Sequence, residues 1–143
     1  MEEGLKIFEE IKNILSKYGV FEDRVELWGT GKPMREFLWS EDMADACVFL
    51  MENRNFSDCI ENKQEIRNTH INIGTGKDLA IADLAKLIQT KVGFHGDFFF
   101  NTSKPDGTMK KLTDVSKLNS LGWKHTITIE EGVQKMYDWY LKK

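Results

Sequence analysis

The stretch RVELWGTGKPMREF, at residues 24–37, carries the clearest folding signal in this sequence. Polar and apolar residues alternate over Arg24–Trp28, which is typical of a short strand. The glycines at 29 and 31 predict a tight turn directly after it, and residues 35–39 predict a second short extended segment. The sequence therefore predicts a strand, a turn and another strand in close succession.

Amphipathic helices are predicted around this unit. Apolar residues recur at helical spacing at 5–18, 41–53 and 81–92. Gly19 and Gly93 are suitable C-terminal stops for the first and third of these helices. Ser40 is a suitable N-cap for the second.

The C-terminal part of the chain carries two further helix-start signals. Asp114 is predicted to cap a short helix that stops at Gly122. Thr128 and Glu131 form a capping-box pattern, which predicts a last helix running to about Leu141. The chain is therefore expected to end in a helix.

The remaining segments complete the expected fold. Two more short strands are predicted at 70–73 and 97–100. Residues 54–69 are polar and aperiodic, so an exposed excursion is expected there. Because strands and helices are interleaved, the predicted class is α/β, of the α+β-like kind with helices packed on small sheets. One domain over 1–143 fits the length.

Charge and composition limit the possible partners. The chain has 143 residues, 41% of them hydrophobic, and a formal net charge of -3. This balance gives no general attraction to nucleic acid or to anionic lipid, and no run of 18 apolar residues predicts a membrane span. Residues 1–15 are unlike a signal peptide. Cys47 and Cys59 are unpatterned, so neither a zinc site nor a disulfide framework is expected, and a cytoplasmic setting is predicted.

The letters GTGK occur twice, at 29–32 and at 74–77. A P-loop needs four residues between its glycines and a Ser or Thr after the lysine, whereas Pro33 and Asp78 stand there. Neither copy has the third glycine of the dinucleotide fingerprint. Both copies are predicted to be tight turns, and the flanking sequences do not match, which favours a coincidence over a repeat.

Catalytic patterns are absent as well. No tyrosine has a lysine four residues later, the three histidines are isolated, and there is no G-x-S-x-G elbow. Cys47 lies within a predicted helix, away from the glycine-containing loops. The sequence therefore predicts no catalytic, cofactor-binding or metal-ligating residue in this chain.

Two loops do concentrate positive charge beside aromatic or glycine residues. Their cations are Lys32, Arg35, Lys104, Lys110 and Lys111. Arginine matches phosphate oxygens well, the Trp28 ring can shelve a sugar or a base, and Asp106 can accept from hydroxyls. The alternatives are a simple K-P-D-G turn, solvated lysines and a core tryptophan. The residues alone leave both interpretations open.

Three segments resemble the C-terminal half of the GDP-L-fucose synthase family, within the extended short-chain dehydrogenase/reductase superfamily. They are WGTGKPMREFLWSEDMADACVFLME at 28–52, HINIGTGKDLAIADLAKLI at 70–88, and SKPDGTMKKLTDVSKLNSLGWKHTITIEEGVQKMYDWYL at 103–141. The pattern K-P-D-G-T-x-x-K-L-x-D-V-S-x-L-x-x-L-G-W, at 104–123, is the narrowest of these signals. The N-terminal helix and lead-in (1–23) and the excursion at 54–69 match only loosely.

The resemblance implies a protein that uses NADPH to epimerise C3 and C5, and to reduce C4, of GDP-4-keto-6-deoxy-D-mannose. It implies that 1–143 is the C-terminal substrate-binding domain. The Rossmann half, with the NADP loop and the catalytic Ser, Tyr and Lys, would then lie outside this chain. No bound cofactor and no activity are expected of the chain alone. Full-length relatives are homodimers mainly through the other half, so a monomer is expected here.

The resemblance also implies the binding residues. Trp28 and Arg35 match the substrate contacts of W-G-x-G-x-P-M-R, and Asp106 and Lys111 match those of K-P-D-G-T-x-x-K. Residues 39–40 (Trp-Ser) depart from the family pattern, which leaves a hexose or a heptose open. Two alternatives stay open: the substrate domain of another nucleotide-sugar epimerase or reductase, acting for example on a GDP-heptose, and a binding module without catalysis.

Overall fold

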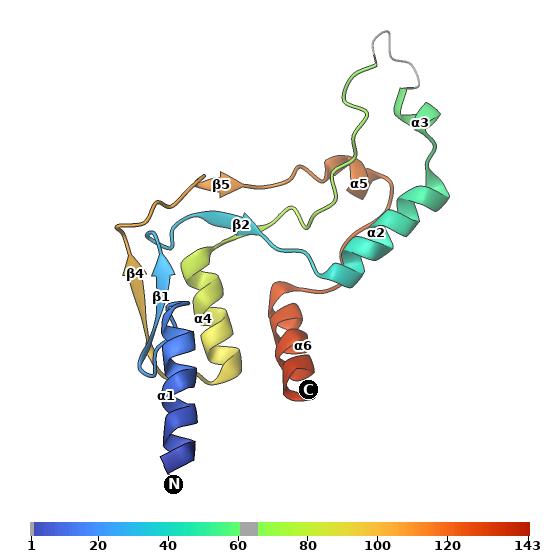
Figure 1. The fold of residues 1–143 in the computed structure, drawn as a ribbon. Coiled ribbons are helices and arrows are strands. Elements are labelled where there is room, and N and C mark those ends of the chain that lie inside the picture. Colours follow the sequence, from blue (N-terminus) through green and yellow to red (C-terminus); the bar gives the residue numbers. More distant parts are fainter. Residues whose placement is uncertain (1, 61–65) are drawn as a thin grey trace. The chain divides into compact units, whose positions relative to one another are not determined.

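The computed structural model describes residues 2–60 and 66–143, which form two compact units (Figure 1). Unit 1 consists of Met1–Pro33 and Ala80–Lys110, and unit 2 consists of Met34–Leu79 and Lys111–Lys143. In the described part of the chain, no helix is long and apolar enough to cross a membrane.

Unit 1 is built on two parallel strands. Its elements are α1 (Glu2–Ser16), β1 (Arg24–Trp28), α4 (Ile81–Val92) and β4 (Asp97–Asn101). Strands β1 and β4 lie side by side in Figure 1, with Arg24 opposite Asp97 and Trp28 opposite Asn101. The side-chain amide of Asn101 (Nδ2) donates to Glu26 Oε1 at 2.7 Å, which adds a side-chain link between the two strands. This pairing holds the first glycine-rich turn at the end of β1.

Glycine is required in this turn for two reasons. The backbone of Gly31 has a φ of 73°, in the left-handed region that other residues rarely adopt. A Cβ at this position would also lie 2.3 Å from the Phe100 ring and 3.0 Å from the Cβ of Ala82. The amide of Ala82 donates to the carbonyl of Gly31 at 2.9 Å. The turn is therefore packed against the start of α4.

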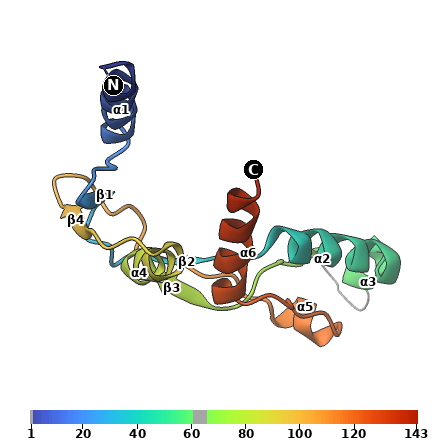
Figure 2. The same ribbon diagram turned by 90° about the horizontal axis from the view of Figure 1, so that it is seen from below.

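Unit 2 contains a small sheet and most of the helices. Its elements are β2 (Met34–Glu36), α2 (Ser40–Asn53), α3 (Phe56–Ile60), β3 (Asp78–Ala80), β5 (Lys110–Lys111), α5 (Ser116–Ser120) and α6 (Ile129–Leu141), with Ala80 and Lys110 at the unit boundaries. The strand order is β3-β2-β5. Figure 2 shows α2, α3, α5 and α6 from below. The predicted mixture of helices and small sheets is confirmed.

The core of unit 2 lies between α2 and the chain around α5. Ala46, Leu118 and Trp123 are buried together, and five apolar side chains pack around them: Leu38, Phe49, Leu50, Ile71 and Ile73. The indole of Trp123 donates to Asp45 of α2 at 2.7 Å. The buried indole N–H is therefore satisfied, as close packing of a tryptophan requires.

A buried carboxylate joins α2 to the segment before α6. Asp42 Oδ1 accepts from the amide of Thr126 at 3.1 Å and from its hydroxyl at 2.7 Å, and Oδ2 accepts from the amide of Ile127 at 3.0 Å. Burial by itself raises the pKa of Asp42, but the donations from Ile127 and Thr126 outweigh burial and lower it. Asp42 is therefore held as a carboxylate that fixes the start of α6.

The strongest local signals are confirmed. Helix α4 ends at Gly93, whose φ of 70° is left-handed, and Thr128 and Glu131 form a complete capping box at the start of α6. Asp114 accepts from the amide of Ser116 at 2.9 Å, but the N-cap of α5 is Val115, without a side-chain cap, so the predicted cap at Asp114 was wrong by one residue. Helix α1, predicted at 5–18, spans Glu2–Ser16. The helix stop at Gly93 and the capping box at Thr128 were therefore predicted correctly.

Several boundaries were predicted wrongly. Residues 70–73 form no strand; this extended segment packs Ile71 and Ile73 on the core instead of pairing. Ser40 does not cap α2, because the helix begins at Ser40 and the N-cap is Trp39, with no side-chain cap. Strand β2 lies at Met34–Glu36 rather than at 35–39.

The polar segment 54–69 is only partly described. Residues 61–65 lie outside the described part, and α3 occupies Phe56–Ile60. The side chains at 54–58 and 66–68 are exposed. The interpretation of 54–69 as an insertion, and of 1–143 as one domain, stays a prediction.

Candidate functional site

The glycine-rich turn at 29–32 is held by the carboxylate of Asp106, which belongs to the K-P-D-G-T-x-x-K motif. The amide of Thr30 donates to Asp106 Oδ1 at 2.6 Å, and its hydroxyl donates to Asp106 Oδ2 at 2.7 Å. A Cβ on Gly29 would lie 2.2 Å from Asp106 Oδ1, so glycine is needed for this close approach. The donations from the backbone and the hydroxyl of Thr30 lower the pKa of Asp106. Asp106 is therefore the ionised partner of this turn.

Trp28 lies directly before this turn, at the end of β1. Its side chain is 70% exposed, which excludes the alternative that it is a core tryptophan. The ammonium of Lys104 lies 5.3 Å from the centroid of the ring, within the range of a cation–π contact. Within unit 1 the structure thus places an open aromatic surface, a cation and the carboxylate of Asp106 around one turn.

Arg35 lies on β2 in unit 2, where it lines a hollow of about 240 Å³. Its guanidinium donates to the carbonyl of Met34 at 2.7 Å. Basic, acidic and hydroxyl side chains share the lining: Lys77, Asp78, Glu130, His125, Thr75 and Thr128. A hollow of this size, with both donors and acceptors, can receive one polar portion of a larger ligand.

Lys111 lies on β5, the neighbour of β2 in the sheet. Its side chain is exposed, and it has no ion pair among residues 2–60 and 66–143. The structure therefore places Arg35 and Lys111 on adjacent strands of unit 2. Trp28 and Asp106 lie on either side of one turn in unit 1.

Sequence reasoning did not single out Glu36. Its Oε1 accepts from the amides of Thr75 and Gly76, both at 2.6 Å, and its Oε2 accepts from the amide of Thr113 at 3.0 Å. Burial raises the pKa of Glu36, but the donations from Thr113, Gly76 and Thr75 outweigh it, so the pKa is lowered. Glu36 is the residue after Arg35, yet its partners are distant in sequence, so no local pattern could identify them.

The two GTGK stretches form the same kind of turn. In each, the threonine hydroxyl accepts from the lysine amide two residues later, at 3.3 Å for Thr30 and 3.2 Å for Thr75. In each, a distant carboxylate accepts from the threonine amide at 2.6 Å. Both copies are tight turns, as predicted, and they share the same pattern of hydrogen bonds.

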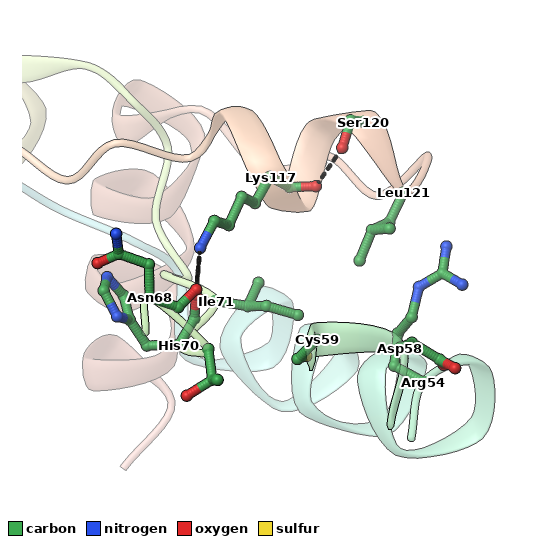
Figure 3. Close-up of a pocket in the computed structure, with 10 residues that line it drawn as sticks. Arg54, Asp58, Cys59, Asn68, His70, Ile71, Lys117, Ser120 and Leu121 are labelled. Carbon is green, nitrogen blue, oxygen red and sulfur yellow. Dashed lines mark hydrogen bonds between the residues drawn. The ribbon is translucent and has the colours of Figure 1, made fainter. Parts of the chain in front are cut away.

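A larger hollow, of about 450 Å³, lies elsewhere in unit 2 (Figure 3). The ammonium of Lys117 there donates to the carbonyls of Asn68 and His70, at 2.5 and 3.1 Å. These bonds tie α5 to the extended segment beside it. None of the four predicted binding residues lines this hollow, so it is not the candidate site.

Among residues 2–60 and 66–143, no three His, Cys, Asp or Glu side chains are grouped in a way that could hold a metal ion.

The chain is similar to a known family and to several known proteins. The family model described as "NAD dependent epimerase/dehydratase family" matches residues 3–74. GDP-L-fucose synthase 1 of Arabidopsis thaliana is 44% identical over 120 residues, which is 84% of this chain and 34% of that protein. GDP-L-fucose synthase of Escherichia coli K12 is 47% identical over 118 residues, 82% of this chain and 36% of that protein.

A solved structure is also closely similar. A GDP-6-OMe-4-keto-L-xylo-heptose reductase from Campylobacter jejuni has a TM-score of 0.89 and 48% identity, over 94% of this chain and 38% of that one. The chain thus spans about a third of the length of the curated relatives it matches. The predicted resemblance to GDP-L-fucose synthases is confirmed.

Proposed function

Because the chain belongs to the NAD dependent epimerase/dehydratase family, we propose that it is the substrate-binding part of a GDP-L-fucose synthase-like epimerase-reductase. The whole protein would epimerise C3 and C5, and reduce C4, of GDP-4-keto-6-deoxy-D-mannose. The observation that carries this proposal is the open Trp28 ring, with Lys104 beside it, at a turn that Asp106 closes. The open ring suits a base or a sugar ring, and the carboxylate of Asp106 suits sugar hydroxyls.

Each binding residue has a proposed task. The guanidinium of Arg35 and the ammonium of Lys111 would bind the diphosphate, because cationic donors form short, charge-assisted hydrogen bonds with phosphate oxygens. The ring of Trp28 would shelve the base or the sugar. Asp106 would accept from a sugar hydroxyl while it closes the turn, because each carboxylate oxygen has two lone pairs.

NADPH supplies the hydride in such a reaction, but the described residues of this chain do not fit that cofactor. A phosphate group binds to free backbone N–H groups at a glycine-rich turn. In both GTGK turns the threonine amide already donates to an internal carboxylate, of Asp106 or of Glu36. A phosphate there would meet a like charge. We therefore assign cofactor binding and catalysis to a part of the protein outside this chain.

A GDP-heptose is the second candidate substrate. The structural neighbour at 48% identity is a heptose reductase by name. The departure at residues 39–40 does not decide the matter, because Trp39 faces Gly132 of α6 and does not line the 240 Å³ hollow. This departure therefore bears on the packing of α6 rather than on the lining of the hollow beside Arg35.

The thiols and the proposed architecture bear on the cellular compartment and on the oligomeric state. Cys47 and Cys59 are free, which suits a reducing compartment, and we propose that the protein is cytoplasmic. We also propose that the chain by itself is a monomer, while the whole protein is a homodimer.

Calorimetric titration of the 143-residue chain with GDP and with UDP tests the proposal. We expect GDP to bind more tightly than UDP, and Arg35→Ala to weaken GDP binding by about tenfold, which is the loss of one charge-assisted contact. Arg54→Ala, in the other hollow, is the matched control and should bind GDP like the wild type. Equal affinities for GDP and UDP, or an Arg35→Ala variant with wild-type affinity, would contradict the proposal.

Two further measurements separate the alternatives. Competition between GDP-mannose and a GDP-mannoheptose distinguishes a hexose site from a heptose site. Oxidation of NADPH by this chain with a 4-keto sugar would show that catalysis does not lie elsewhere. A binding module without catalysis would bind GDP and remain inactive even in the whole protein.

A further inference from the structure

Glu36 connects three segments of unit 2 that are distant in sequence. Its two oxygens receive hydrogen bonds from the second GTGK turn and from the segment after β5. The donors are the amides of Thr75, Gly76 and Thr113, at 2.6, 2.6 and 3.0 Å, and the hydroxyl of Thr75, at 3.2 Å. A single carboxylate on β2 therefore fixes the place of both neighbouring segments.

Two of these segments adjoin a residue of the proposed binding site, and the third lines the same hollow as Arg35. Arg35 shares a peptide bond with Glu36, and Lys111 lies two residues before Thr113. Thr75 lines the same 240 Å³ hollow as Arg35. A movement of the Glu36 side chain would therefore move the surroundings of Arg35 and Lys111 together.

We propose that Glu36 is a positioning residue, which sets Arg35 and Lys111 at the spacing that a diphosphate requires. This inference rests on the proposed function. Glu36 itself does not touch the ligand; it acts through the turn at Thr75–Gly76 and through Thr113. The half-buried position of Glu36 supports the proposal, because a buried amide that loses its acceptor is strongly disfavoured.

Both the charge and the length of the side chain are needed for this task. A glutamine has the same length, but one of its two terminal atoms is an NH2 group, which cannot accept from an amide. Glu36→Gln therefore loses the bond to Thr113 or the bonds to the turn, while the shape of the residue is kept. Glu36→Asp keeps the charge but is one methylene shorter, so it cannot reach both segments.

Two experiments on the 143-residue chain test this proposal. The first measures hydrogen exchange and ¹⁵N relaxation by NMR, without ligand. In Glu36→Gln we expect exchange at least tenfold faster at the amides that lose their acceptor, with increased motion at Arg35 and Lys111. Glu41→Gln, an exposed glutamate that accepts from the indole of Trp39, is the control and should leave these signals unchanged.

The second experiment measures GDP affinity in the same variants. We expect Glu36→Gln and Glu36→Asp to lose about tenfold in affinity while circular dichroism shows the helices intact. Wild-type affinity in Glu36→Gln, despite faster exchange, would mean that Glu36 only stabilises the fold and would overturn the proposal. If the wild type binds no GDP, the proposed function fails. Relaxation then still decides: unchanged motion at Arg35 and Lys111 in Glu36→Gln overturns the positioning role, and increased motion supports it.

Discussion

Asp106 closes the turn at Thr30 from 76 positions further along the chain, accepting from its amide at 2.6 Å and from its hydroxyl at 2.7 Å. Glu36 does the same for Thr75 from 39 positions earlier. Glycine-rich turns are usually read as binding sites for an external anion. In this chain the anion is a side chain of the protein itself. Both turns are therefore held by internal carboxylates, and Trp28 lies directly before the first of them.

The Asp106 contact predicts a loss of stability in Asp106→Ala. The variant leaves the amide and the hydroxyl of Thr30 without their acceptor. The turn after β1 is then no longer bonded to the loop that contains residue 106. We expect a lower melting temperature by circular dichroism, with a smaller decrease in Asp106→Asn, which keeps one acceptor. Asp23→Ala is the control, since Asp23 is an exposed residue of the same unit that bonds its neighbour Arg24. Equal melting temperatures for Asp106→Ala and the control would contradict this account.

Alanine substitutions at two glycines with nearly equal φ distinguish the cost of backbone strain from the cost of overpacking. Gly31 and Gly93 have φ of 73° and 70°, but an added Cβ meets Phe100 at 2.3 Å in the first case and open space in the second. We expect Gly93→Ala to lower the free energy of unfolding by about 1 kcal/mol, the cost of a left-handed alanine. Gly31→Ala should cost about 3 kcal/mol, because the overpacking adds to the strain.

Urea unfolding of the two glycine variants measures this difference. The comparison is internally controlled, since both glycines follow regular elements of unit 1. If the two variants lost the same free energy, the close packing of the first turn against Phe100 would be refuted.

The sequence predicted features that depend on residues close together in the chain. The capping box of Thr128 and Glu131 and the stop at Gly93 need only one helical turn of context, and both are present. The contact between Glu36 and Thr75 spans 39 positions, and no local pattern encodes such a pairing. For the same reason, the apolar residues of 70–73 predicted burial correctly but not whether a partner strand was within reach.

The candidate site shows the same division. The motifs predict that Trp28 is a binding residue, and its ring is open in the folded chain. They also assigned Asp106 to the substrate alone, because its bonds to Thr30 depend on the folded chain. The sequence did not predict a role for Glu36, because a glutamate in a short strand has no distinctive local pattern. Residue types were thus predictable, whereas the internal partners that hold them were not.

The Asp42 contact predicts a second stability effect, at the start of α6. Asp42→Ala removes the acceptor of Thr126 and Ile127 from a buried place, and we expect a loss of about 2–3 kcal/mol in the free energy of unfolding. Glu52→Ala, on the exposed side of the same helix, should change it by less than about 0.5 kcal/mol. Urea unfolding measures both. A loss below about 1 kcal/mol in Asp42→Ala would mean that water replaces the carboxylate there.

The lowered pKa of Glu36 predicts a dependence of stability on pH. Its ordinary value is 4.5, and in the folded chain it is lower, so folding favours the charged form. The stabilising contribution of Glu36 is then complete above pH 4.5 and is lost as the pH falls through the lower, folded pKa. We expect the wild type to lose stability more steeply than Glu36→Gln in this acid range. Urea unfolding from pH 7 to about pH 3 measures this, and other carboxylates such as Asp42 cancel because both proteins contain them. Parallel curves for the two proteins would show that Glu36 does not titrate differently in the folded state.

The open ring of Trp28 makes ligand binding visible by fluorescence. Trp28 is 70% exposed, whereas Trp123 is buried and donates to Asp45, so acrylamide should quench Trp28 far more than Trp123. If the ring shelves the base or the sugar, saturating GDP-mannose protects Trp28 from quenching, and Trp28→Ala loses about tenfold in affinity. Trp28→Phe should retain part of that affinity because it keeps an aromatic face. Trp139→Phe is the control, because it replaces an exposed tryptophan of α6 outside the motifs. Protection lost in Trp139→Phe but kept in Trp28→Ala would place the ligand on α6 and refute the role assigned to Trp28.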